Sequence, residues 1–145
     1  MKAPAKIRRG EGGHFIGDPS KPAARRRRRR EEESIQKAFA RWCRFSLRDN
    51  VLWHSIPNEG RRPVSQLMNL IAMGLTPGAA DFAIIHDGRL FYIEFKAASG
   101  LQAAQQAEFE RRARNAGAAY AVARSCEEAV ALLDGWGIPH REVRR

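Results

Sequence analysis

The stretch that decides the fold runs from Gly74 to Gly100 and reads GLTPGAADFAIIHDGRLFYIEFKAASG. It holds two apolar runs, 82–85 and 90–95, on either side of an Asp87-Gly88 pair. An Asp-Gly pair between two apolar runs is among the strongest short signals for a β-hairpin with a tight turn. The stretch therefore predicts two buried, antiparallel strands.

Two carboxylates and a lysine, Asp81, Glu94 and Lys96, stand on or directly beside the apolar runs of this hairpin. Alternate side chains of a strand share a face, so Glu94 and Lys96 project together, and Asp81 begins the first strand after a Pro-Gly turn. Neighbouring strands lie only about 5 Å apart, which brings Asp81 and Glu94 within reach of one cation. Burying ionised groups is costly unless something pairs them. The pattern therefore indicates either a metal site or an ordinary cross-strand ion pair.

The segments around the hairpin alternate between helical and strand patterns. The expected order is a helix over 31–49, a strand over 51–56, a helix over 63–73, the hairpin, a helix over 102–115, a strand over 118–123 and a helix over 125–133. This order predicts an α/β domain in which a small mixed β-sheet is flanked by helices.

The formal charge of +10 is concentrated at the N-terminus. Residues 1–30 hold eleven Lys or Arg against two acids, a net of +9, whereas residues 31–145 hold fifteen against fourteen, a net of +1. Because 1–30 has few large apolar side chains, we expect it to be a disordered arm and the folded domain to cover 31–145. A strongly basic arm suits a polyanion such as DNA, although a solvated tail or a targeting stretch has the same composition. The candidate phosphate contacts in the arm are Arg25, Arg26, Arg27, Arg28, Arg29 and Arg30.

Cysteine usage and hydropathy argue against several other classes. Cys43 and Cys126 lie far apart and outside any CxxC pattern, so zinc, redox-pair and disulfide scaffolds are not indicated. Apolar runs stay well below the roughly 18 residues of a membrane span, and the N-terminus lacks the apolar core of a secretory signal. A soluble cytoplasmic protein is therefore expected.

Several short motifs occur in one order and at set distances along the chain, and this combination is more specific than any one of them. They are NEGRR (58–62), MGLTPGAADF (73–82), FYIEFKA (91–97) and a glutamine, Gln106, ten residues after Lys96. With this block, residues from about 32 to 133 resemble the VRR-NUC (virus-type replication-repair nuclease) family of the PD-(D/E)xK nuclease superfamily. The resemblance implies a PD-(D/E)xK restriction-endonuclease-like core. Ala80 stands where the family motif has proline, at a position that shapes the turn.

The resemblance assigns roles to particular residues. Asp81, Glu94 and Lys96 match the family's catalytic positions, and Gln106 matches a glutamine that lines the site from the following helix, with Gln105 as the weaker alternative. An Mg2+ or Mn2+ cofactor is implied. Mg2+ takes one or two protein carboxylates and leaves its other positions to water and phosphate. We expect Asp81 and Glu94 to hold it, with the backbone carbonyl of Phe95 as a further ligand.

The family also carries a glutamate on its first helix, for which Glu31, Glu32 and Glu33 compete. At about 100° per residue, Glu33 points roughly opposite to the apolar face of this helix, whereas Glu31 and Glu32 both lie about 50° from its middle. Glu32 also stands four residues before Gln36, as in the family pattern E-x-x-I-Q. Glu32 is therefore the expected catalytic acid and a candidate metal ligand. The alternative is that all three are first-turn acids that interact with the helix dipole.

By resemblance, the expected function is a metal-dependent, structure-selective DNA endonuclease, similar to Holliday-junction resolvases. Such stand-alone forms act as homodimers on branched or flapped DNA and are commonly encoded by phages or prophages, which implies a bacterial or phage-infected cytoplasm. Two alternatives are a DNA-binding module of the same fold with weak or absent catalysis and a sequence-specific, restriction-like endonuclease. Further candidate DNA contacts, unless their loop is simply solvated, are Asn58, Arg61 and Arg62.

Overall fold

The computed structural model describes residues 22–57 and 62–141. Its elements are α1 (Pro22–Ser46), β1 (Leu52–Ser55), α2 (Val64–Ala72), β2 (Phe82–His86), β3 (Arg89–Phe95), α3 (Ala104–Asn115), β4 (Ala119–Ala123) and α4 (Cys126–Gly135). This is the predicted order of helices and strands. The hairpin is also confirmed, because its turn residues Asp87 and Gly88 have φ values of 48° and 69°, the left-handed conformation that Asp-Gly adopts in tight hairpin turns.

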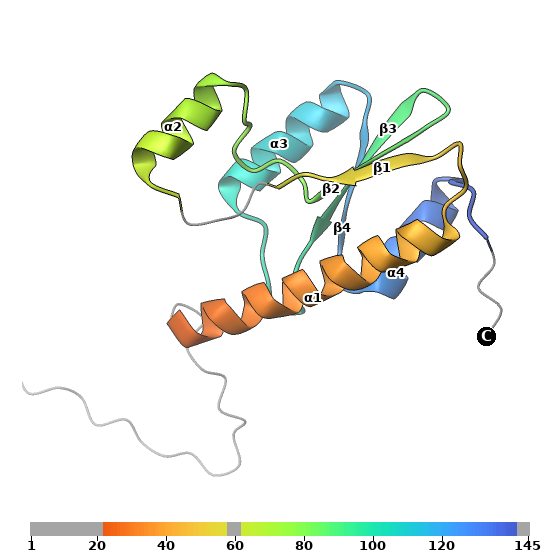
Figure 1. The fold of residues 1–145 in the computed structure, drawn as a ribbon, viewed down its shortest axis with the longest axis horizontal. Coiled ribbons are helices and arrows are strands. Elements are labelled where there is room, and N and C mark those ends of the chain that lie inside the picture. The colour runs from red at the N-terminus through yellow and green to blue at the C-terminus, as the bar shows by residue number, and fades with distance from the viewer. Residues whose placement is uncertain (1–21, 58–61, 142–145) are drawn as a thin grey trace, which may run out of the picture.

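Within the described residues, the four strands form one sheet in the order β1-β2-β3-β4. β2 is antiparallel to both β1 and β3, whereas β3 and β4 are parallel. The sheet is therefore mixed, as predicted, and α3 is the crossover that parallel strands require. In Figure 1, α1 and α4 lie on one side of the sheet and α2 and α3 on the other.

The main core lies between the sheet and helices α1 and α4. Phe91, Ile93 and Phe95 of β3 all point into it, where they meet Phe39 of α1 and Leu133 of α4. A smaller cluster on the opposite face of the sheet joins Ala80, Ala113 and Tyr120. Since side chains alternate along a strand, Glu94 projects toward this second face, where α3 lies.

Helix α1 begins at Pro22 and not at Glu31, so the expectation of disorder is not met for residues 22–30. Proline suits the first helical position, and arginine has a high helix propensity, so the helix extends outward along the arginine run. The six arginines Arg25–Arg30 therefore have fixed angular positions on a helix. The rest of the expected arm, 1–21, lies outside the described residues.

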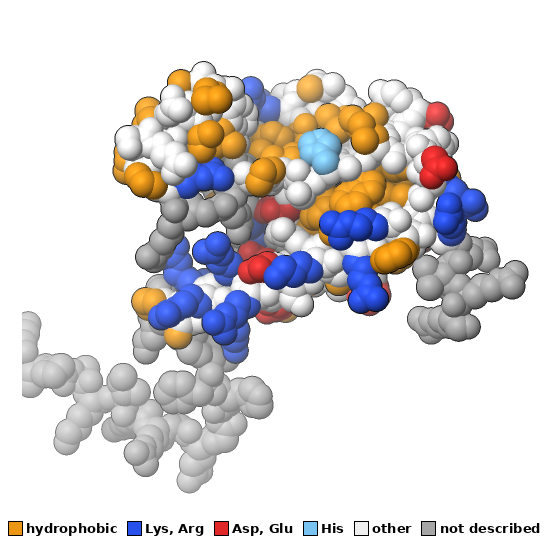
Figure 2. Space-filling model, viewed as in Figure 1, with side chains coloured by type: hydrophobic (Ala, Val, Ile, Leu, Met, Phe, Trp, Pro, Cys, Tyr) orange, Lys and Arg blue, Asp and Glu red, His pale blue; other side chains and the backbone are white. Residues whose placement is uncertain are grey.

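Helix α2 exposes its apolar face. All nine of its residues are described and none of them is buried, with Val64 77 % and Met68 59 % exposed. Figure 2 shows these apolar side chains over α2 at the upper left. Among the helices of the described residues, none has both the length and the apolar content that crossing a membrane requires.

Candidate active site

The two carboxylates of the hairpin meet where β2 begins and β3 ends. The strand register pairs Phe82 with Ile93, and its continuation sets Asp81 opposite Glu94. Both acids are buried, with exposed fractions of 7 % for Asp81 and 2 % for Glu94. Oδ2 of Asp81 accepts a hydrogen bond from the backbone N–H of Phe95 at 2.7 Å. Because Cβ atoms of residues directly opposite lie about 4.5–5.5 Å apart, the two carboxyl groups occupy one site.

Two donors converge on Glu94. Nζ of Lys96 lies 2.8 Å from its Oε1, and the side-chain amide of Gln106 donates to the same oxygen. Gln106 is held in turn, because its own Oε1 accepts the N–H of Ala103 at 2.8 Å. Gln105 is exposed, so Gln106 is the glutamine that reaches the carboxylate.

Gly78 allows the start of α3 to come this close. Its φ is +79°, and a Cβ atom there would lie 2.3 Å from the carbonyl oxygen of Gln105 and 2.7 Å from the backbone nitrogen of Gln106. A side chain at this position would therefore push α3 away from the turn that precedes Asp81. The glycine in the Pro-Gly turn fixes the approach of Gln106 to Glu94.

Of the three acids of α1, one points to the surface and two point toward the sheet. Glu33 pairs with Lys37 at 2.7 Å on the surface. Glu32 and Glu31 instead turn toward the end of β3, where each accepts one backbone hydrogen bond at 3.0 Å, from Ala97 and Ala98 respectively. The helical phase thus correctly separates Glu33 from Glu32. The carboxylate of Glu32 holds the backbone that directly follows Lys96.

Arg124 also reaches this backbone, and sequence patterns do not single it out. Its guanidinium donates to the carbonyl oxygens of Ala97 at 2.5 Å and Gly100 at 2.9 Å. A lone arginine after a strand carries no recognisable signal, because its partners lie more than twenty positions away in the chain. Only the parallel pairing of β3 with β4 brings them together.

The donor set fits a small divalent cation. Within 22–57 and 62–141, no group of three or more His, Cys, Asp or Glu side chains gathers as a metal site. Mg2+ needs only one or two protein carboxylates, however, and Asp81 and Glu94 supply two. The Phe95 carbonyl as a third ligand, and Glu32 as a fourth, remain predictions.

The site's negative charge reaches Tyr120. Burial, and after it the charge of Glu94, raises the pKa of the Tyr120 hydroxyl. Its oxygen accepts a hydrogen bond from Nε2 of Gln102 at 3.2 Å. Tyr120 is therefore neutral at physiological pH and serves as a packing residue beneath α3.

A pocket of about 370 Å³ opens beside the carboxylates, between α2, the turn before β2 and the start of α3. Its lining includes Asp81, Gln106 and Arg62. Arg62, one of the predicted DNA contacts, therefore lies at the same opening as the catalytic candidates. The other two, Asn58 and Arg61, are outside the described residues.

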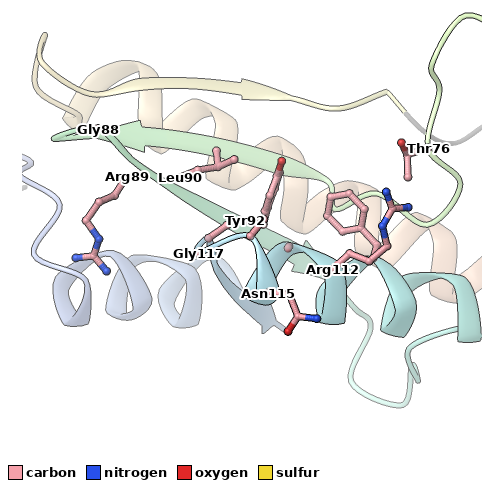
Figure 3. A pocket seen from close by; sticks show the side chains of 12 residues that line it. Thr76, Gly88, Arg89, Leu90, Tyr92, Arg112, Asn115 and Gly117 are labelled. Atoms are coloured by element: carbon pink, nitrogen blue, oxygen red, sulfur yellow. The ribbon is translucent and has the colours of Figure 1, made fainter.

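A larger pocket of about 680 Å³ lies farther along the same face, between α3 and the first half of β3 (Figure 3). Among the described residues that line it there is no carboxylate, and Lys96 and Gln106 do not reach it. In Figure 3 the side chains of Arg89 and Asn115 point away from Arg112, so its polar groups do not converge on one ligand. The smaller pocket is therefore the one associated with the candidate chemistry.

Comparison with known proteins supports the fold. No protein-family model and no curated protein matches the chain. A solved structure described as a VRR_NUC domain protein is similar over 77 % of this chain and 93 % of its own, with a TM-score of 0.59 and 17 % sequence identity. The chain thus has the fold of a VRR_NUC domain protein, as the sequence motifs predict.

Proposed function

We propose that this chain is a divalent-metal-dependent deoxyribonuclease that hydrolyses phosphodiester bonds in branched DNA. The observation that carries the proposal is the buried cluster of Asp81, Glu94 and Lys96 at adjoining strand ends, beside an open pocket. Burying three ionisable groups costs free energy, and clusters of this kind concentrate at functional sites. The likeness to a VRR_NUC domain protein supports the same reaction class.

The side chains have distinct roles in this proposal. Asp81 and Glu94, with the Phe95 carbonyl, would hold the Mg2+ or Mn2+ ion, which when bound polarises the phosphate and generates hydroxide from water. Lys96 orients the attacking water and offsets the charge that develops on the phosphate oxygens. Gln106 keeps the Glu94 carboxylate in place through its amide.

DNA would be held by positive charge on both sides of the carboxylates. Figure 2 shows Lys and Arg side chains gathered over the N-terminal half of α1, which carries Arg25–Arg30. Arg62 stands on the other side, at the pocket that Asp81 lines. Neutralising phosphates supplies most sequence-independent DNA affinity, so these residues set how strongly binding depends on salt.

The preference for branched DNA and the homodimer belong to the same proposal. A four-way junction needs two paired cuts, and the described residues of one copy offer a single cluster of catalytic candidates. The apolar side chains that α2 exposes, Val64 and Met68 among them, support a contact between two copies. Solution mass tests this part, because a monomer at micromolar concentration would exclude it.

A DNA-binding module without catalysis is the second candidate. The observation in its favour is that Lys96 forms an ion pair with Glu94, which neutralises the charge of this carboxylate. One experiment separates the two. The protein is incubated with a labelled four-way junction and with a linear duplex of matched sequence, in Mg2+, in Mn2+ and in chelator. Cleavage of the junction in Mg2+ or Mn2+ but not in chelator supports the proposal. Binding of the junction without cleavage under all three conditions supports the DNA-binding module.

A further inference from the structure

The carbonyl groups of the turn that follows Lys96 are held by one side chain, which comes from the end of the neighbouring strand β4. Ala97–Gly100 is a tight turn, closed by a hydrogen bond from the Gly100 N–H to the Ala97 carbonyl at 2.8 Å. The guanidinium of Arg124 donates to both of these residues and makes a longer, 3.4 Å contact with the carbonyl of Ala98. Three carbonyl groups of one turn thus face the guanidinium of Arg124.

The position of Arg124 is itself fixed with respect to Lys96. Phe95 pairs with Ala123 in the parallel ladder, and the N–H of Lys96 donates to the Ala123 carbonyl at 3.0 Å. Lys96 and Arg124 are therefore the next residues on adjoining strands. The N–H of Arg124 is bound at 2.7 Å by the carboxylate of Glu128, in the first turn of α4. The backbone of Lys96 is thus anchored to β4, and the backbone of Arg124 is anchored to α4.

We propose that Arg124 is a positioning residue, which sets the place of Lys96 by holding the Ala97–Gly100 turn. The catalytic half of this inference rests on the proposed nuclease function. Both bonds come from Nη1 of Arg124, and the rigid plane of the guanidinium fixes the direction of its two N–H groups, which a lysine ammonium on a flexible stem does less well. Without Arg124, the carbonyls would turn to water and the backbone after Lys96 would relax.

The Ala97–Gly100 turn is also closely packed around Gly100, so the hydrogen bonds of Arg124 can hold its position. A Cβ atom at Gly100 would lie 3.1 Å from Oε1 of Glu32 and 3.2 Å from the carbonyl oxygen of Ala97. The acids of α1 hold the amides of the turn while Arg124 holds its carbonyls. A shift of the turn would therefore move Lys96 and Glu32 together.

Arg124→Ala and Arg124→Lys test this inference, with Arg114→Ala as the matched control. The Arg114 guanidinium donates to the Tyr120 carbonyl at 2.7 Å, so the control also removes an arginine–carbonyl bond, away from the turn. For Arg124→Ala we expect kcat to fall about 10- to 100-fold, because small misplacements of catalytic groups cost this much, with little change in Kd for DNA. Arg124→Lys should recover part of the rate, and Arg114→Ala should keep it.

Hydrogen exchange provides a readout that does not depend on cleavage. In Arg124→Ala, the amides of Ala97, Ala98 and Gly100 should exchange about tenfold faster or more, as expected when a hydrogen bond is removed, while the α3 amides stay protected. Faster exchange with no cleavage by the wild type would uphold the turn's anchor and overturn the nuclease function instead. Unchanged exchange, or a wild-type kcat in Arg124→Ala, would overturn the inference. So would a drop in DNA affinity alone, which would make Arg124 a phosphate-binding residue.

Discussion

Nζ of Lys96 lies 2.8 Å from Oε1 of Glu94, and both side chains are buried. The two residues stand on one face at the end of β3, and Gln106 donates to the same oxygen. An ion pair of this kind satisfies a buried carboxylate, but removing one partner leaves the other charge uncompensated. A bound metal ion would also compensate the charge of Glu94. The stability that the Lys96–Glu94 pair contributes should therefore depend on whether a cation is bound.

Lys96→Ala is expected to destabilise the protein by about 3–5 kcal/mol in chelator, since it breaks a buried pair. Part of this stability should return in Mg2+ or Mn2+, because a bound cation offsets the charge of Glu94. Urea denaturation with and without metal measures both effects. The control is Lys37→Ala, whose pair with Glu33 is exposed and screened by solvent, so its loss should change stability far less. Equal losses of stability in the two variants would show that the Lys96–Glu94 pair contributes no more than an exposed ion pair.

Gly78→Ala should separate α3 from the turn before Asp81. The new Cβ meets the backbone of Gln105 and Gln106, which cannot rotate aside as a side chain can. Gly74→Ala is the control, because Gly74 also has positive φ but nothing within 4 Å of its Cβ position. The positive φ alone costs about 1–2 kcal/mol, so Gly78→Ala should cost clearly more in denaturation experiments. Equal costs would mean that α3 adjusts without strain.

The arginines of α1 should contribute unequally to DNA binding. Seen along the helix axis, Arg25 and Arg28 lie within about 40° of Glu32, whereas Arg27 and Arg30 lie about 140–160° away. Replacing Arg25 and Arg28 with serine should lower the slope of log K against log salt by about 1.8, because each phosphate that is no longer neutralised lowers it by about 0.9. The Arg27/Arg30 double variant has the same net charge and should change the slope less. Equal slopes would show that the run acts as unspecific charge.

Local patterns predict the hairpin and much of the cluster. Asp-Gly fixes the turn, strand alternation places Glu94 beside Lys96, and helical phase separates Glu32 from Glu33. What they do not predict is the set of long-range partners. The acceptor role of Glu32 toward Ala97 spans 65 positions, and the hydrogen bonds of Arg124 depend on parallel strand pairing. The early start of α1 escapes prediction for another reason, since a run of like charges resembles a disordered tail although arginine favours helices.

The central claim is that Asp81 and Glu94 together hold one divalent cation. Its most direct test is calorimetric titration of Mn2+ into the wild-type protein, Asp81→Asn, Glu94→Gln and the control Glu33→Gln, whose acid pairs with Lys37 on the surface. We predict binding to the wild type and to Glu33→Gln, and no binding to either hairpin variant. Wild-type affinity in Asp81→Asn or Glu94→Gln would contradict the claim and leave the buried carboxylates with a structural role alone.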